Sequence, residues 1–237
     1  MIAAVINAFL VLLGGIVGLV FKSRITEKHS SAIITGLGLC VFVIGIMSAI
    51  GSKNLLCVII SIVFGIIIGE LLGIEDRLDN IGNAIKTKFM KGRDAGRFTE
   101  GFMSATLLFC VGSMAIMGSM EAGINNDYSI ILSKSVIDCV TAVTFAAAMG
   151  VGVCFSAFGV LIYQGLLTMI FIWVGPFLPE AIITEMSAVG GLLIIGLSIN
   201  MLGLSGEKRV KVGNMLPAIF FPLIYIPVAD WIATLFA

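Results

Sequence analysis

The chain has 237 residues, of which 59% are apolar and only 12% are charged, and its formal net charge at pH 7 is zero. Soluble domains are about 45–50% apolar and about 25% charged, so a water-soluble fold of this size could not bury so much hydrocarbon. The composition excludes an ordinary cytosolic enzyme, a disordered tail and a nucleic-acid-binding protein. It predicts an all-α, polytopic bundle of transmembrane helices.

Eight apolar runs follow one another along the chain, each long enough to cross a bilayer as a helix. Their predicted bounds are 2–21, 32–50, 55–73, 101–121, 130–150, 153–175, 182–204 and 214–236. No basic residue precedes the first run and no cleavage site is obvious, so we interpret it as a retained span rather than a signal peptide. We treat residues 1–237 as a single integral membrane domain in a lipid bilayer.

The basic residues predict the orientation of these spans. With the N-terminus outside, twelve of the fourteen Lys and Arg residues fall in inner loops. Lys53 alone lies in an outer loop, and Lys134 lies inside a span. This positive-inside bias indicates a multi-pass membrane protein with both termini outside.

The longest connection, 74–100, has the pattern of an amphipathic helix on the inner membrane surface. Its apolar residues recur at spacings of three and four, namely Ile74, Leu78, Ile81, Ile85 and Phe89. A structural elbow is the simpler interpretation of this inner amphipathic connector. A regulatory or lipid-sensing role is the alternative.

The sequence contains a short internal similarity. Related hexapeptides open the first and sixth spans, at Asn7 and Ser156, and an acidic residue lies late in the third and eighth spans, Glu70 and Asp230. Matching spans are five apart, and this odd offset makes the two copies cross in opposite directions. An inverted repeat of spans 1–3 and 6–8 is therefore predicted, as in many secondary transporters. Chance similarity between apolar segments is the alternative interpretation.

Lys134 and Asp138 are the strongest local signal for a site. They are four residues apart and so share one helix face. Asp138 is expected roughly 12 Å inside the outer end of its span, near mid-bilayer. An unpaired charge there costs at least about 2.5–3.5 kcal/mol, and a Lys–Asp pair removes much of that cost. The pair is interpreted as a substrate or proton site, with a structural ion pair as the alternative.

Three amides lie in other spans and are predicted as secondary contacts of the same polar site: Asn7, Gln164 and Asn200. Each amide on its own is more typical of interhelical hydrogen bonding. We expect the five residues together to bind an ion or a small solute.

Glycine and proline predict how the spans pack. Gly14 and Gly18, like Gly65 and Gly69, form ladders that let helices approach closely, and they offer a route to a homo-oligomer. Three prolines should prevent a straight last span: Pro217, Pro222 and Pro227. Three glycines are expected to loosen the seventh span: Gly190, Gly191 and Gly196.

No motif for catalysis or metal binding is complete. Residues 203–206 match the GxSG of rhomboid-type proteases, but the one histidine of the chain, His29, lies in a basic inner loop. The five cysteines are scattered through apolar runs without a CxxC pair. We therefore predict no enzyme activity, no catalytic residue, no cofactor and no metal site.

Several stretches resemble the bacterial membrane proteins of domain-of-unknown-function family 554. The resemblance rests on the run from Asn7 to Gly18, on 109–119, on the Lys134–Asp138 pair and on 155–165. It covers essentially the whole chain. The resemblance implies a bacterial inner-membrane protein to which a transport role has been ascribed. It supplies no established substrate or catalytic residue.

These observations together predict a small secondary transporter of an ion or small solute in the plasma (inner) membrane. A passive channel is the nearest alternative and would show flux that does not saturate. A scaffold or sensor that does not transport is the alternative from another class, and its polar groups would be fully paired. The sequence does not identify the substrate.

Overall fold

The computed structural model describes residues 2–22, 26–89, 97–174, 178–206 and 208–236, and these form helices without any strand. The elements are α1 (Ile2–Lys22), α2 (Glu27–Ala49), α3 (Leu55–Leu72), α4 (Ile74–Phe89), α5 (Phe98–Val111), α6 (Ser113–Ile124), α7 (Ser129–Met149), α8 (Gly152–Val174), α9 (Glu180–Met201), the 3₁₀ helix η3 (Val212–Phe220) and α10 (Pro222–Phe236). Six of these helices are long and apolar enough to cross a membrane, or eight spans result if each of two bent pairs counts as one. The all-α transmembrane class is confirmed.

The two bent pairs replace two of the predicted spans. The span expected at 101–121 is α5 followed by α6, which meet at Gly112 with a bend of 53°. The span expected at 214–236 is η3 followed by α10, with a bend of 42° at Pro222. Proline lacks the N–H that would continue the helix, so the second bend follows from the sequence.

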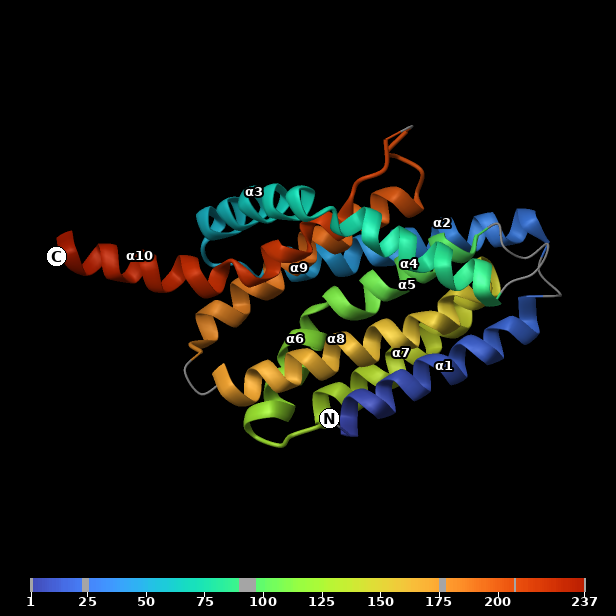
Figure 1. Ribbon diagram of the computed structural model, residues 1–237, viewed down its shortest axis with the longest axis horizontal. Helices are drawn as coiled ribbons and strands as arrows, with labels where there is room; N and C mark the ends of the chain where they lie inside the picture. The colour runs from blue at the N-terminus through green and yellow to red at the C-terminus, as the bar shows by residue number, and fades with distance from the viewer. Residues whose placement is uncertain (1, 23–25, 90–96, 175–177, 207, 237) are drawn as a thin grey trace.

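The helices form two groups that lie against each other (Figure 1). The first group, lower in the figure, contains α1, α5, α6, α7 and α8, with α1 packed along both α7 and α8. The second contains α2, α3, α9, η3 and α10, with α2 along α9 and α3 along η3. The boundary between the two groups contains the cavity described below.

The spans of the predicted repeat lie side by side in pairs. The first three spans each lie beside their proposed counterparts: α1 beside α8, α2 beside α9 and α3 beside η3. The two helices of each pair run in opposite directions in Figure 1. Spans five apart run in opposite directions with or without a repeat, so the inverted repeat remains a prediction that superposition of the two triplets would test.

Glycines permit the closest contacts within each group. Gly14 and Gly18 of α1 lie against backbone carbonyls of α7, and Gly65 and Gly69 of α3 lie against η3, where an added Cβ would overlap neighbouring atoms. Both glycine ladders thus pack inside the chain, and a homo-oligomer would need another surface. The expected loosening of the seventh span is wrong, because α9 continues unbroken and Gly191 packs against the backbone of α2.

The connector after α3 contains α4. Gly73 adopts a left-handed conformation, with φ of 58°, and ends α3 so that α4 begins at once. Leu78 and Ile85 pack against the core, whereas Ile81 is half exposed. The remainder of the predicted connector includes 90–96, which lie outside the described residues.

The turn between α2 and α3 is attached to α9 by one buried carboxylate. Glu185, only 2% exposed, accepts a 2.6 Å hydrogen bond from the Ser52 hydroxyl. It also accepts hydrogen bonds from the backbone N–H groups of Lys53 (2.8 Å) and Asn54 (3.0 Å). Because three donors satisfy this carboxylate, its burial is tolerated.

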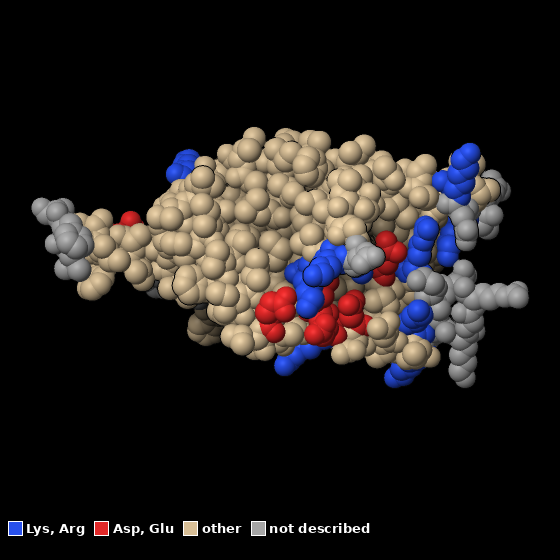
Figure 2. Space-filling view, turned by 90° about the horizontal axis from the view of Figure 1, so that it is seen from above, with Lys and Arg blue, Asp and Glu red and all other residues tan. Residues whose placement is uncertain are grey.

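Charged side chains are unevenly distributed over the surface (Figure 2). On the face shown, Lys and Arg gather near the end where α1 ends and α2 begins, and around an acidic cluster near the middle. Most of the rest of this face is uncharged, as expected for helices that contact lipid.

Candidate functional site

Lys134 and Asp138 form an ion pair inside the bundle. One turn of α7 brings their side chains together, and the two residues are 5% and 6% exposed. The Lys134 ammonium also lies 5.9 Å from the ring centroid of Phe109 on α5, within the range of a cation–π interaction. The two charges therefore neutralise each other in an otherwise apolar environment.

Two amides from other helices complete a buried polar cluster. The Asn7 side-chain nitrogen, on α1, donates to Asp138 Oδ2 at 3.1 Å and to Gln164 Oε1, on α8, at 2.9 Å. Asn7 and Gln164 are fully buried. Four of the five residues predicted for the site thus meet at the contact between α1, α7 and α8.

The cluster retains unused hydrogen-bonding capacity. Among the described residues, neither Asn7 Oδ1 nor Gln164 Nε2 has a hydrogen-bond partner, although both atoms are buried. The same holds for the Tyr163 hydroxyl on α8 and the Ser119 hydroxyl on α6. Buried polar atoms are normally paired, so these four atoms are exceptions among the described residues.

Asn200 lies outside this cluster. Its side chain donates to the Val210 carbonyl and accepts from the Val210 N–H, both at 2.8 Å. Two such bonds to one residue fix the chain that leaves α9. The structure therefore gives Asn200 a local structural partner and does not bring it to Asp138.

A cavity of about 340 Å³ lies beside the ion pair, between the two groups of helices. Lys134 and Asp138 line it, together with apolar residues of α2, α5, α6, α7 and α9: Leu37, Val41, Ile44, Leu108, Phe109, Met114, Ile137, Phe145 and Ile194. Ile44 on α2 and Ile137 on α7 are about half exposed, so the cavity opens between these two helices. Asn7 and Gln164 do not line it and contact Asp138 from α1 and α8.

The break between α5 and α6 lies at the wall of this cavity. Gly112 has extended backbone angles, φ −62° and ψ 149°, and no side chain caps the start of α6. The last carbonyls of a helix and the first N–H groups of the next have no partner within their own helix. Leu108 and Phe109 before the break and Gly112 and Met114 after it line the cavity. The only signal of this break in the sequence is a glycine inside an apolar run, so the span predicted at 101–121 is continuous and does not include the break.

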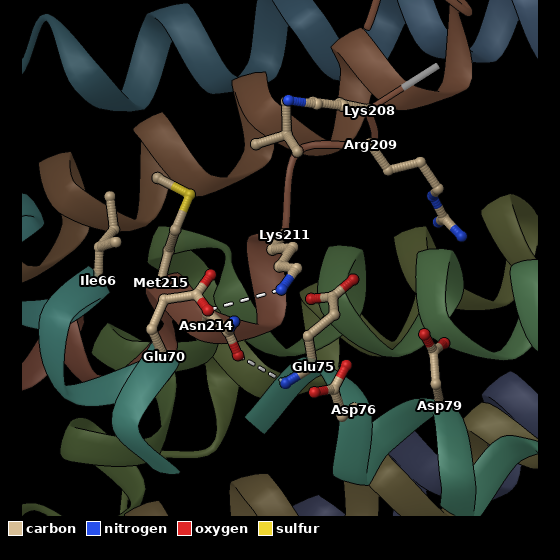
Figure 3. A pocket seen from close by; sticks show the side chains of 11 residues that line it. Ile66, Glu70, Glu75, Asp76, Asp79, Lys208, Arg209, Lys211, Asn214 and Met215 are labelled. Atoms are coloured by element: carbon tan, nitrogen blue, oxygen red, sulfur yellow. Dashed lines mark hydrogen bonds and ion pairs between the residues drawn. The ribbon is translucent and has the colours of Figure 1, made fainter. Parts of the chain in front are cut away.

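A second pocket, of about 540 Å³, lies where α3 and α4 meet η3 (Figure 3). Acidic residues of α3 and α4 and basic residues of the segment before η3 line it: Glu70, Glu75, Asp76, Asp79, Lys208, Arg209 and Lys211. Lys211 points toward Glu70, at 3.5 Å between charged atoms. Asn214 accepts a 2.7 Å hydrogen bond from the Glu75 backbone, and Glu75 in turn accepts one of 2.5 Å from the Gly213 N–H. Neither Glu75 nor Asn214 belongs to a motif that could be recognised from the sequence.

The hydrogen bonds of Glu75 fasten α4 to η3. Glu75 is only 8% exposed, and burial raises the pKa of its carboxyl above its ordinary range. The Gly213 N–H and the nearby Arg209 and Lys211 charges lower the pKa of Glu75, and Asp79 raises it. Within the described residues, no group of three or more His, Cys, Asp or Glu side chains could hold a metal ion.

Comparison with known proteins finds relatives over nearly the whole chain. The model of a family described as "Protein of unknown function (DUF554)" matches residues 2–226. The "Uncharacterized membrane protein YdfK" of Bacillus subtilis (strain 168) is 28% identical over 230 residues, which cover 95% of this chain and 96% of that protein. The "Uncharacterized protein YqgA" of Escherichia coli (strain K12) is 30% identical over 221 residues, or 92% and 93% of the two chains. No solved structure matches.

Proposed function

We propose that this chain, which belongs to the DUF554 family, is a small secondary transporter of an ion or small solute. The observation that carries the proposal is the buried Lys134–Asp138 pair, which lines a cavity inside the membrane-spanning bundle. Charged side chains within spans are costly, and they are generally found along substrate or ion pathways.

Two further features of the cavity support transport. It lies between two groups of helices, so a shift of one group against the other would change its access. It also borders the broken pair α5 and α6, and discontinuous helices commonly form substrate sites in transporters because they offer unpaired backbone groups.

The orientation and location are part of this proposal. We place the protein in the bacterial plasma (inner) membrane with both termini outside, on the strength of the basic residues assigned to inner loops. The proposed transport cycle requires no catalytic residue and no cofactor.

The test is transport by purified protein in liposomes. Currents on a supported membrane would first be recorded with amino acids, organic acids, sugars and inorganic ions. Any solute that gives a current would then be used in a counterflow experiment, in which unlabelled solute inside the vesicles drives accumulation of labelled solute. Counterflow that saturates, and that is lost in the Lys134→Met/Asp138→Asn double variant, is the expected result.

The control is Thr144→Val on the same helix. The Thr144 hydroxyl donates to the Val140 carbonyl of the same helix and does not line the cavity, so the substitution should leave counterflow intact. Flux without saturation or counterflow would identify a channel. A folded protein that gives neither current nor counterflow with any of these solutes would favour the scaffold or sensor.

A further inference from the structure

The cavity offers two opposite charges at one place. The Lys134 ammonium has three donors, and its one hydrogen-bond acceptor among the described residues is Asp138 Oδ2. Asn7 donates to that same oxygen, while no hydrogen bond from the described residues reaches Asp138 Oδ1. Both side chains line the cavity, so a ligand there meets an ammonium and a carboxylate with bonding capacity left over.

The break between α5 and α6 places two helix ends of opposite partial charge at the same cavity. The C-terminal end of a helix carries partial negative charge and the N-terminal end partial positive charge. Residues at the end of α5 and at the start of α6 both line the cavity, on either side of Gly112. The two helix ends at this break therefore lie at the wall of the same cavity as the ion pair.

The rest of the cavity is apolar and of limited size. Its other walls are dominated by Leu, Ile, Val, Phe and Met side chains. A cavity of about 340 Å³ is at the lower end of the roughly 300–1,000 Å³ of typical ligand pockets. A hydrated inorganic ion would gain nothing from such walls, whereas a short hydrocarbon side chain would.

We infer that the cavity binds a small zwitterion with an apolar side chain, namely an α-amino acid of about the size of leucine. This inference rests on the proposed function and names its substrate class. The ligand carboxylate pairs with Lys134, and the ligand ammonium pairs with Asp138. When a zwitterion binds, two ion pairs between protein and ligand replace the Lys134–Asp138 pair. The buried site gains no net charge. A ligand with a single charge would leave one protein charge without its partner, which is strongly unfavourable.

The test measures equilibrium binding of tritiated leucine to purified protein in detergent, with three competitors of related carbon skeleton. Isocaproate lacks the amino group, isoamylamine lacks the carboxylate, and isohexanol lacks both charges. Leucine should saturate the protein, and each competitor should bind at least about tenfold more weakly, because it pairs fewer of the two buried charges. Methionine and valine should compete in the same range as leucine.

Variants test the assigned contacts. Lys134→Met and Asp138→Asn should each abolish leucine binding. Because these variants could fail to fold, Thr141→Leu provides a second test that leaves both charges in place. Thr141 lines the cavity, so its enlargement should weaken leucine binding at least about tenfold and leave alanine binding nearly unchanged. Thr144→Leu, one turn further along α7 and outside the cavity, is the matched control.

Specific outcomes would overturn the inference. No binding of leucine, methionine, valine or alanine would do so, as would isocaproate or isoamylamine binding as tightly as leucine. Tight binding of isohexanol would instead identify a groove for a lipid chain. Because binding is measured without a membrane, the two proposals fail separately. Amino-acid binding without counterflow would support this inference and contradict the transporter proposal. Counterflow of another solute without amino-acid binding would support the transporter proposal and contradict this inference.

Discussion

Asn7 on α1 donates a 3.1 Å hydrogen bond to Asp138 on α7, to the same carboxylate oxygen that pairs with Lys134. This bond crosses 131 residues of sequence and joins two helices that also pack along much of their length. Because Asn7 does not line the cavity, it acts as a positioning residue that fixes the carboxylate.

Replacing Asn7 by Leu should destabilise the protein by about 1–3 kcal/mol, because Gln164 Oε1 loses its donor in a fully buried place. The double variant Asn7→Leu/Gln164→Met should be less destabilised than Asn7→Leu alone, since the unpaired Gln164 amide is then absent. Thermal unfolding in detergent provides the comparison. A double variant that is less stable than Asn7→Leu would contradict this account of the amide pair.

Neutralising one partner of the ion pair should cost more than neutralising both. Lys134→Met alone leaves a buried carboxylate without its ammonium, and losses of about 3–5 kcal/mol are usual for such changes. Lys134→Met/Asp138→Asn should recover much of that stability in a double-mutant cycle. This double variant then distinguishes a transport site from a structural ion pair. If the pair is the site, the double variant should fold but show no counterflow. If it folds and transports normally, the pair only orients α7.

The glycine contacts predict a matched pair of alanine variants. Gly14→Ala places a Cβ into the Cys139 carbonyl and should destabilise the protein by about 1–3 kcal/mol. Gly36→Ala on α2 meets nothing within 4 Å and should be neutral, or stabilising by up to about 1 kcal/mol. Melting temperatures of the two variants would show the difference, and equal melting temperatures would argue against the close packing of α1 on α7.

Glu75 predicts a pH dependence of stability. Its pKa is raised in the folded state, mainly by burial, so the folded state retains the proton to higher pH than the unfolded state does. The contribution of this residue to stability is therefore greatest below its ordinary pKa and is lost as pH rises through the raised value. Glu75→Gln should flatten the fall of melting temperature over that range. An unchanged pH profile would show that Glu75 titrates normally.

The orientation is tested by reporter fusions. Fusions at Ser205 and at Ala237 should report opposite sides of the membrane, because one crossing separates them in the eight-span prediction. The Ala237 reporter should be outside, together with the N-terminus. A cytoplasmic signal from Ala237 would require a different number of spans.

Periodicity and charge predicted most of the helices and the centre of the candidate site. The Lys134–Asp138 contact follows from the spacing of four in a helix, and the apolar runs give α1, α3, α7 and α8 within a few residues. Asn7 and Gln164 are predicted as secondary contacts of this pair because both are amides inside spans, but their mutual contact depends on how α1 packs against α8. The sequence predicts no such packing distances.

The remaining features depend on tertiary contacts that no local pattern contains. Gly112 breaks a span, whereas the Gly190–Gly191 pair lies in an unbroken helix, although both occur in apolar runs. The difference lies in the neighbours: Gly191 packs directly against the α2 backbone, and Gly112 borders a cavity. Asn200 was predicted at the site on residue type, but the chain after α9 turns back and supplies its partner at Val210.

Glu185 has a mechanical consequence for any opening of the cavity. Its hydrogen bonds to Ser52, Lys53 and Asn54 couple α9 to the tip of the α2–α3 hairpin, and the close approach of Gly69 to η3 couples that hairpin to the last span. A shift of α9 against this hairpin would break these part-buried hydrogen bonds. Opening of the cavity would therefore require this group of helices to rotate as one rigid body about its boundary with α7. A cross-link inside the group would leave that rotation intact.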